Sequence, residues 1–240
     1  MTEAGKIIIT GTGRAGTTFL MQLLTELGLD TGYTRETWRE DYNVHCAAGL
    51  ERDLADPKAP RIVKSPAFCE TLPALLAGGG VIVAHAIIPV RALDEAASSR
   101  IWIGGRGKTA GGLWGTTNAL RQKSVLAENF HQLMHTLAVH DIPHTLLDFP
   151  RFARDEDYTR RKLQWLLADI DAVTFAAAFN RVSRPELIHN FSQGLPPGAG
   201  QATRIQRNHR WRRRARRLLL GGLVAIIAWI IYLWQHPHRP

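Results

Sequence analysis

The sequence predicts an α/β domain, built on a mostly parallel sheet flanked by helices, with a transmembrane helix after it. Three observations indicate this architecture. A β-branched run at residues 6–10 is followed by a glycine-rich loop and a helical pattern. Further strand-length apolar runs then alternate with helical patterns, which is typical of parallel sheets. Finally, residues 218–234 contain no charged side chain.

The first elements frame a predicted phosphate-binding loop. Residues 6–10 (KIIIT) predict a buried strand, and residues 19–27 have the apolar spacing of a helix that Gly28 would end. Between them lies GTGRAGTT at residues 11–18. Backbone N–H groups and the helix dipole converge at such a junction, so the pattern predicts an anion cradle. The alternative is a glycine turn that binds no ligand.

The loop departs from the nucleotide triphosphatase pattern at one position. Its Gly11-x4-Gly16 spacing matches a Walker A loop, which defines a P-loop-type fold, but Thr17 stands where that motif requires Lys. The cation lies inside the loop instead, as Arg14. Because the missing lysine normally contacts the β- and γ-phosphates, its absence argues against ordinary ATP or GTP chemistry.

Residues 14–18 (RAGTT) resemble the 5′-phosphosulfate loop, (K/R)-x-G-T-T, of bacterial sulfotransferases that use 3′-phosphoadenosine 5′-phosphosulfate (PAPS). Ala15 stands where serine is commoner in that family. The resemblance covers roughly residues 6–190, specifically at the loop and loosely elsewhere. It implies that the donor PAPS contacts the loop residues Gly13, Arg14, Ala15, Gly16, Thr17 and Thr18.

Two later strands carry further residues that the resemblance assigns. Residues 61–66 (RIVKSP) predict a second strand, and the resemblance implies that Lys64 lies near the sulfonate; a strand-end lysine directed to solvent is the alternative. Residues 81–90 are apolar on both faces, which predicts a central parallel strand. The family holds the 3′-phosphate with an Arg at this strand end and a Ser eight residues later, as Arg91 and Ser99 stand here. Alternatively, the Arg caps a carbonyl and the Ser faces solvent.

The remaining segments supply the frame. A helix is expected at residues 92–102, and the glycine-dense stretch 103–117 predicts either a mobile flap over a site or a surface loop. Residues 118–140 predict a helix, 144–149 a strand and 154–167 a capped helix.

The general base is the least constrained role. Residues 30–60 predict an irregular region with helical pieces over the carboxyl edge of the sheet. Some membrane-linked sulfotransferases use a Glu at about the separation from the loop at which Glu36 occurs, with Trp38 beside it. The alternative is a solvated Glu36. His85, within an apolar strand, is interpreted as a core residue rather than a base.

No metal site is predicted, because His131 and His135 are four residues apart without a third ligand nearby. The two cysteines, Cys46 and Cys69, are too few for a disulfide framework.

The C-terminal tail accounts for the net charge of +9. Residues 1–203 are formally neutral, and the excess consists of nine arginines between Arg204 and Arg239. Residues 194–217 predict a linker and an arginine-rich juxtamembrane segment, and 218–234 would span roughly 25 Å as a helix, with 235–240 as a short tail. The arginines favour anionic lipid headgroups over nucleic acid and place the domain on the cytoplasmic side.

Together these features predict a sulfotransferase domain at residues 1–193, tail-anchored in a membrane, which moves a sulfonate from PAPS to a hydroxyl or amine of an unknown acceptor. Arg14, Glu36 and Lys64 are the expected catalytic residues. The alternatives are a nucleotide-dependent kinase with a degenerate Walker A loop, or a non-catalytic membrane-attached P-loop module.

Overall fold

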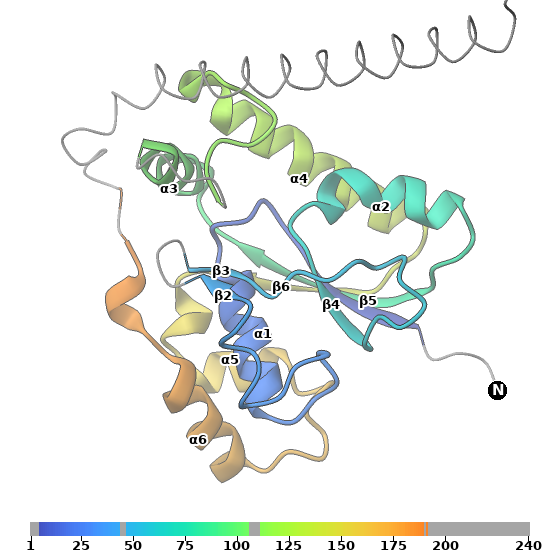
Figure 1. The fold of residues 1–240 in the computed structure, drawn as a ribbon, viewed down its shortest axis with the longest axis vertical. Coiled ribbons are helices and arrows are strands. Elements are labelled where there is room, and N and C mark those ends of the chain that lie inside the picture. The colour runs from blue at the N-terminus through green and yellow to red at the C-terminus, as the bar shows by residue number, and fades with distance from the viewer. Residues whose placement is uncertain (1–4, 44–46, 106–110, 190, 192–240) are drawn as a thin grey trace, which may run out of the picture.

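The computed structural model describes residues 5–43, 47–105, 111–189 and 191, and within them the chain forms an α/β domain (Figure 1). Its main sheet has the strand order β4-β1-β5-β6, and every neighbouring pair is parallel. The strands are β1 (Lys6–Ile9), β4 (Ile62–Lys64), β5 (Val83–Val90) and β6 (His144–Asp148). The predicted mostly parallel sheet is confirmed, and so is the central position of the apolar strand, because β5 pairs with both β1 and β6.

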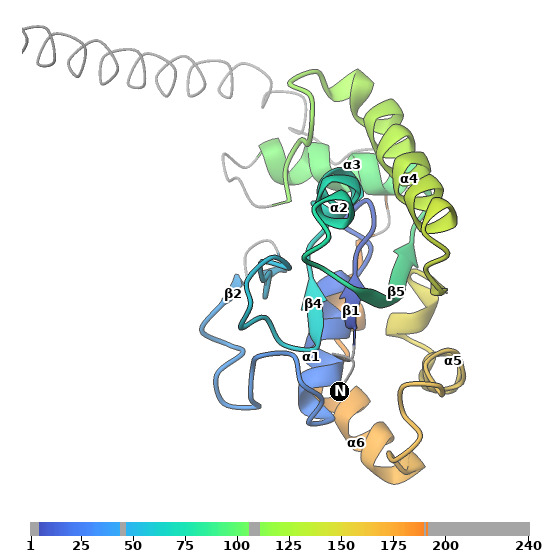
Figure 2. The same ribbon diagram turned by 90° about the vertical axis from the view of Figure 1, so that its right-hand side faces the viewer.

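Helices cover both faces of this sheet (Figures 1 and 2). On one face lie α2 (Phe68–Ala77), α3 (Leu93–Gly105) and α4 (Gln122–Val139), the last preceded by the 3₁₀ turn η1 (Ala119–Arg121). On the other face lie α1 (Thr17–Glu26), α5 (Glu156–Lys162) and α6 (Ala172–Val182), with the short turns η2 (Arg151–Ala153) and η3 (Pro185–Leu187).

The alternation of side chains along β1 divides the core between these two faces. Ile7 and Ile9 join the cluster formed by α1, α5 and α6, whereas Ile8 joins the cluster of α2 and α4. All three are at most 1% exposed. A strand that is buried on both faces must be apolar at every position, which explains the unbroken isoleucine run.

Helix ends follow the expected local chemistry. Gly28 adopts φ 78° directly after α1, and its N–H donates to the Thr25 carbonyl at 2.9 Å. A capped helix was expected here, and the N-cap of α5 is Asp155, whose carboxylate accepts from the Tyr158 N–H at 2.8 Å.

The region after α1 differs from its prediction. Residues 35–41 form turns, and the only regular structure described between residues 30 and 60 is a small antiparallel ladder of β2 (Tyr42–Asn43) and β3 (Ala48–Gly49). The expected helical pieces are therefore wrong. Thr34 and Thr37 hold this turn, since the Thr34 N–H donates to the Thr37 hydroxyl at 2.9 Å and the Trp38 N–H donates to the Thr34 carbonyl at 3.2 Å.

The predicted linker and transmembrane segment, from residue 194 to the C-terminus, lie outside the described residues. Within the described ranges, no helix has both the length and the apolar character needed to cross a bilayer.

Candidate functional site

The predicted phosphate loop lies at the carboxyl end of β1 and leads directly into α1. Gly13 and Gly16 take φ 68° and 82°, values that favour glycine. Gly16 is also the N-cap of α1, and a Cβ at this position would lie 2.8 Å from the Phe152 ring. Among the described residues, no side chain caps this helix terminus. The loop therefore turns around a glycine that tolerates no substituent and directs the start of α1 at the space above it.

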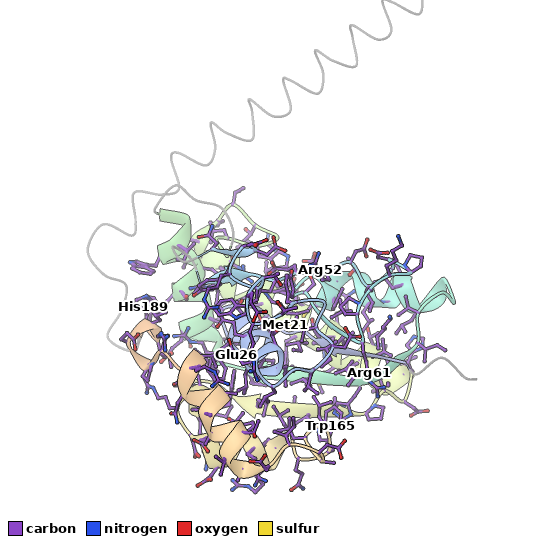
Figure 3. All side chains as sticks on the ribbon, turned by 60° about the horizontal axis from the view of Figure 1, so that its bottom comes forward. Met21, Glu26, Arg52, Arg61, Trp165 and His189 are labelled. Carbon is purple, nitrogen blue, oxygen red and sulfur yellow. The ribbon has the colours of Figure 1, made fainter. Side chains whose placement is uncertain are left out.

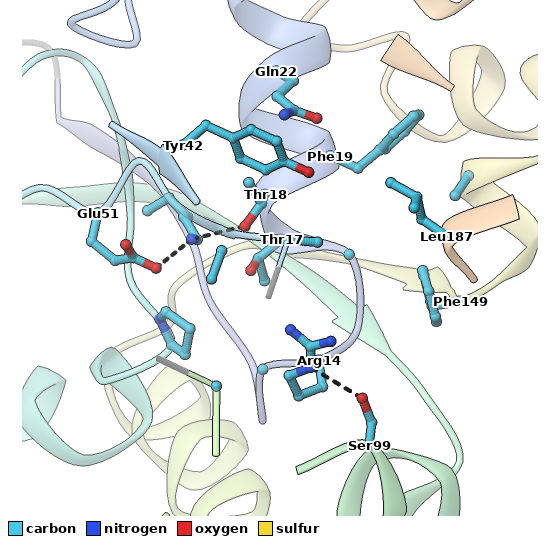
Figure 4. A pocket seen from close by; sticks show the side chains of 18 of the residues that line it. Arg14, Thr17, Thr18, Phe19, Gln22, Tyr42, Glu51, Ser99, Phe149 and Leu187 are labelled. Atoms are coloured by element: carbon cyan, nitrogen blue, oxygen red, sulfur yellow. Dashed lines mark hydrogen bonds and ion pairs between the residues drawn. The ribbon is translucent and has the colours of Figure 1, made fainter. Parts of the chain in front are cut away.

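Arg14 joins the loop to α3. Its backbone is left-handed, with φ 57°, and its Nε donates to the Ser99 hydroxyl at 3.1 Å (Figure 4). Arg91, at the end of β5, donates from Nη1 to the Arg14 carbonyl at 3.1 Å. Three residues that the sequence placed on separate elements thus lie around one loop.

Arg91 is held from several sides. It is 6% exposed, and its Nη2 donates to the Glu95 carboxylate at 2.9 Å and to the His189 carbonyl at 2.5 Å. Its guanidinium also lies 5.1 Å from the Phe149 ring centroid. Arg91 therefore does cap carbonyls, as one sequence interpretation held, while it also lines the cavity described below.

Lys64 is directed into the protein, so its solvent-directed alternative is wrong. The side chain is 1% exposed. Its Nζ donates to the Thr18 hydroxyl at 3.2 Å, to the Gly49 carbonyl at 2.6 Å and to the Glu51 carboxylate at 2.5 Å (Figure 4). The ammonium group thus joins the first turn of α1 to the β2–β3 ladder.

Glu36 does not reach the loop in this structure. It is exposed in the turn after α1 and is not among the cavity-lining residues. A hydrogen bond with Thr34 is the main cause that lowers the pKa of its carboxyl. The turn directs Trp38 into the protein instead, where its Nε1 donates to the Glu26 carboxylate at 3.2 Å. The geometry therefore favours the solvated interpretation of Glu36.

Glu51 is the acidic residue that the fold brings to the loop, and the sequence analysis did not identify it. It lines the cavity, its side chain is 45% exposed, and it pairs with Lys64. No local motif marks Glu51, because its position depends on the ladder that packs it against the end of β4.

Arg100 is a second unanticipated residue. It is 5% exposed, and its two Nη atoms donate to the carbonyls of Thr12 at 2.7 Å and Gly112 at 2.8 Å. Its Nε is buried without a hydrogen-bond partner in the described residues. Burial, followed by the nearby Arg14 charge, lowers the pKa of Arg100 to about 10, so it stays charged at neutral pH. Arg100 thereby links the phosphate loop to residues 111–114.

The predicted flap is described in part. Gly111, Gly112, Leu113 and Trp114 line the cavity, and residues 106–110 lie outside the described ranges. The flap's mobility stays a prediction.

These residues surround a cavity of about 860 Å³, near the upper end of the roughly 300–1,000 Å³ usual for ligand sites. Figure 4 shows Arg14 and Ser99 at one end, Gln22 and Tyr42 at the other, and Thr17 between them. Its charged lining is strongly cationic, because only Glu51 among the described lining residues is acidic. The cationic lining residues are Arg14, Arg39, Lys64, Arg91, Arg100, Arg181 and Arg184.

His85 and the histidine pair lie apart from this cavity. His85 forms a hydrogen bond with the Thr145 hydroxyl at 2.9 Å and packs at a tilt against the Trp165 ring, and it does not line the cavity. His131 and His135 have ring centroids 6.3 Å apart. Among the residues that the structure describes, no group of three or more His, Cys, Asp or Glu side chains is close enough to hold a metal ion.

Comparisons with known proteins yielded one likeness. No family model matches the chain, and no curated protein matches it. A solved structure described as the sulfotransferase domain from the curacin biosynthetic pathway aligns with 86% of this chain and 98% of its own, at 11% identity and a TM-score of 0.45. A likeness at this level does not establish a family or an activity for this chain.

Proposed function

We propose that this chain is a sulfotransferase that moves a sulfonate from PAPS to a hydroxyl or amine. The observation that carries the proposal is the meeting of Arg14, Arg91 and Ser99 around a glycine loop at the head of α1. The sequence motif predicted these positions separately, on a loop, a strand end and a helix. A plain glycine turn would not require them to lie together.

The residues present fit a donor of this charge. The N-terminus of α1, which no described side chain caps, and the Arg14 side chain suit the 5′-phosphosulfate. Ser99 and Arg91 suit the 3′-phosphate. Arg100 adds a buried cation whose Nε has no partner within the described chain, which favours an anionic ligand close by.

The chemistry needs charge stabilisation and a proton acceptor. An acceptor oxygen or nitrogen attacks the sulfonate sulfur in line, the bond from sulfur to the phosphate oxygen breaks, and 3′,5′-ADP leaves. In this proposal Arg14 and Lys64 stabilise negative charge on the leaving oxygen. Glu51, rather than Glu36, is the cavity carboxylate that could take the proton from the acceptor.

Calorimetry with 3′,5′-ADP and with ATP–Mg²⁺ tests the donor assignment. We expect tight binding of 3′,5′-ADP and weak binding of ATP–Mg²⁺. The reverse order would indicate a kinase, and the absence of both would indicate a non-catalytic module. Transfer of labelled sulfate from PAPS to lipid and glycan acceptors then tests the reaction itself.

We also propose that residues 204–234 attach the chain to an anionic membrane, with the domain on the cytoplasmic side. The support is compositional: arginines adjoin an uncharged apolar run. Flotation of the full chain with vesicles tests this, and recovery in the unbound fraction would contradict it.

A further inference from the structure

One end of the cavity carries large apolar side chains beside Gln22, and it lies away from the residues assigned to the donor. Phe19 and Tyr42 lie beyond Thr17 and Thr18, away from Ser99, and Leu187 lies to one side of Thr17 (Figure 4). Phe19 packs on Phe152, with ring centroids 5.7 Å apart. A donor held by the loop, Arg91 and Ser99 would leave this end for the acceptor. The apolar surface suits an alkyl or aromatic body.

The apolar lining formed by Phe19, Tyr42 and Leu187, here called the apolar wall, lies beside a set of contacts at the end of α1. Glu26, the last residue of α1, is 3% exposed and lies where α1 meets α6 (Figure 3). Its carboxylate accepts from Trp38 Nε1 at 3.2 Å and from Arg181 Nε at 3.0 Å. Both partners line the cavity. These contacts form without an acceptor, and Arg181 pairs with the Glu26 carboxylate at 3.0 Å, which also lies 3.8 Å from Arg35 Nε.

Two further arginines that line the cavity, Arg39 and Arg184, have no such carboxylate partner in the described part of the chain. Arg39 lies over the Trp38 ring at 4.5 Å from its centroid, and its Nη1 donates to the Arg35 carbonyl at 2.8 Å. Arg184 donates from Nη1 to the Ser183 carbonyl at 2.7 Å. Both are exposed and line the cavity, and neither forms an ion pair with a carboxylate in the described part of the chain.

We infer that the acceptor is an anionic amphiphile: an apolar body that carries the hydroxyl or amine, with a carboxylate or similar acidic group bound by Arg39 and Arg184. This inference rests on the proposed function and specifies its substrate class. The apolar wall holds the body, and the two arginines bind the acidic group at the cavity rim. A neutral alcohol of the same length would keep the apolar contacts and lose only the interaction with the two arginines.

Calorimetry with a matched pair of probes tests this inference. The full chain is first titrated with 3′,5′-ADP, and the saturated protein is then titrated with 10-hydroxydecanoate and with 1,10-decanediol. Because 3′,5′-ADP occupies the donor end, the acid cannot gain affinity from Arg14 or Arg91. We expect the acid to bind about tenfold more tightly than the diol.

Variants assign the preference to the two arginines. The double variant Arg39→Gln, Arg184→Gln should bind the acid no better than the diol, with diol and 3′,5′-ADP affinities unchanged. Arg61→Gln is the matched control, since Arg61 is exposed, does not line the cavity and lies away from His189 (Figure 3). It should change nothing.

The outcomes separate this inference from the proposed function. If 3′,5′-ADP binds but the diol matches the acid, if neither probe binds, or if the double variant keeps the preference, the acceptor class is wrong and the sulfotransferase proposal stands. If 3′,5′-ADP does not bind, the proposed function falls, and the acceptor role falls with it.

Discussion

Arg14 occupies a conformation that an arginine does not favour. Its φ of 57° lies in the left-handed region, where a residue with a Cβ loses roughly 1 kcal/mol or more relative to glycine. The same backbone places Nε on Ser99 and the carbonyl against Arg91. A loop residue that is strained and cationic is better explained by a ligand than by packing.

Replacement of Arg14 separates these two contributions. Arg14→Ala should lower turnover by roughly 100-fold, because it removes one preorganised stabilising group. Arg14→Gly should lower it equally while relieving the backbone, so its melting temperature should equal or exceed that of the wild type. Steady-state transfer assays and thermal melts provide both readouts. Near wild-type turnover in either variant would remove Arg14 from the mechanism.

Glu51 and Glu36 form a matched pair for the base. Glu51→Gln keeps the size of the side chain and removes its basicity, so turnover should fall by about 100-fold or more while 3′,5′-ADP affinity stays within about twofold. Glu36→Gln should leave both unchanged, since Glu36 is exposed and outside the cavity lining. The opposite result would restore Glu36 as the base.

Some of the site residues could be predicted from the sequence, and others could not. The loop and its positive-φ glycines follow from local spacing, which fixes the geometry around Gly16. Lys64 was identified because the family resemblance assigns a role to the lysine at the end of the second strand. Glu51 and Arg100 were not, because each acquires its position from a contact distant in sequence: Glu51 from the β2–β3 ladder, and Arg100 from the Thr12 and Gly112 carbonyls.

At the scale of elements, prediction depended on length and periodicity. The strands β1 and β5 are recognisable from the sequence because a strand that is buried on both faces must be apolar almost continuously. The ladder of β2 and β3 consists of two residues on each strand, too few for any period to emerge. The helix α2 was not predicted, and it contains Pro73, a residue that normally marks a helix boundary.

The junction of β5, β6 and Trp165 should respond to pH. His85 bonds to Thr145 and packs at a tilt against the Trp165 ring, with ring centroids 3.9 Å apart, and burial, followed by the His144 charge, lowers the pKa of His85. Because the pKa of His85 is lower in the folded chain, His85 binds a proton more readily in the unfolded chain when the pH falls below the usual histidine pKa of 6.5. Stability should accordingly fall as the pH drops below that value.

Urea denaturation at pH 7.5 and pH 5.5 measures this effect. The wild type should unfold at a lower urea concentration at pH 5.5, and His85→Gln should reduce the difference between the two midpoints. The exposed His140 provides the control, and His140→Gln should keep the wild-type difference. An equal difference in all three proteins would show that His85 does not carry the pH dependence.

At the scale of the molecule, the site follows from topology. The phosphate loop after β1, Lys64 at the end of β4 and Arg91 after β5 all occupy the carboxyl ends of neighbouring parallel strands. Ligands of open α/β sheets bind at that edge. The fold class alone therefore predicts where the cavity lies. The residues that line it also come from α6 and from the turn after α1, and no sequence pattern predicted that these two segments lie at the same cavity.

The charge distribution leads to a last prediction about the molecule. Residues 1–203 are formally neutral, and the excess positive charge and the uncharged run at residues 218–234 both lie beyond them. Among the described residues, the last one that lines the cavity is His189, and we expect deletion of residues 204–240 to leave the site intact. We expect the truncated chain to be monodisperse, to bind 3′,5′-ADP with wild-type affinity and to lose binding to anionic vesicles. Size-exclusion chromatography, calorimetry and vesicle flotation measure the three properties. A truncated chain that aggregates or loses 3′,5′-ADP would show that the tail belongs to the folded domain, and one that still floats with vesicles would assign membrane binding to the domain instead.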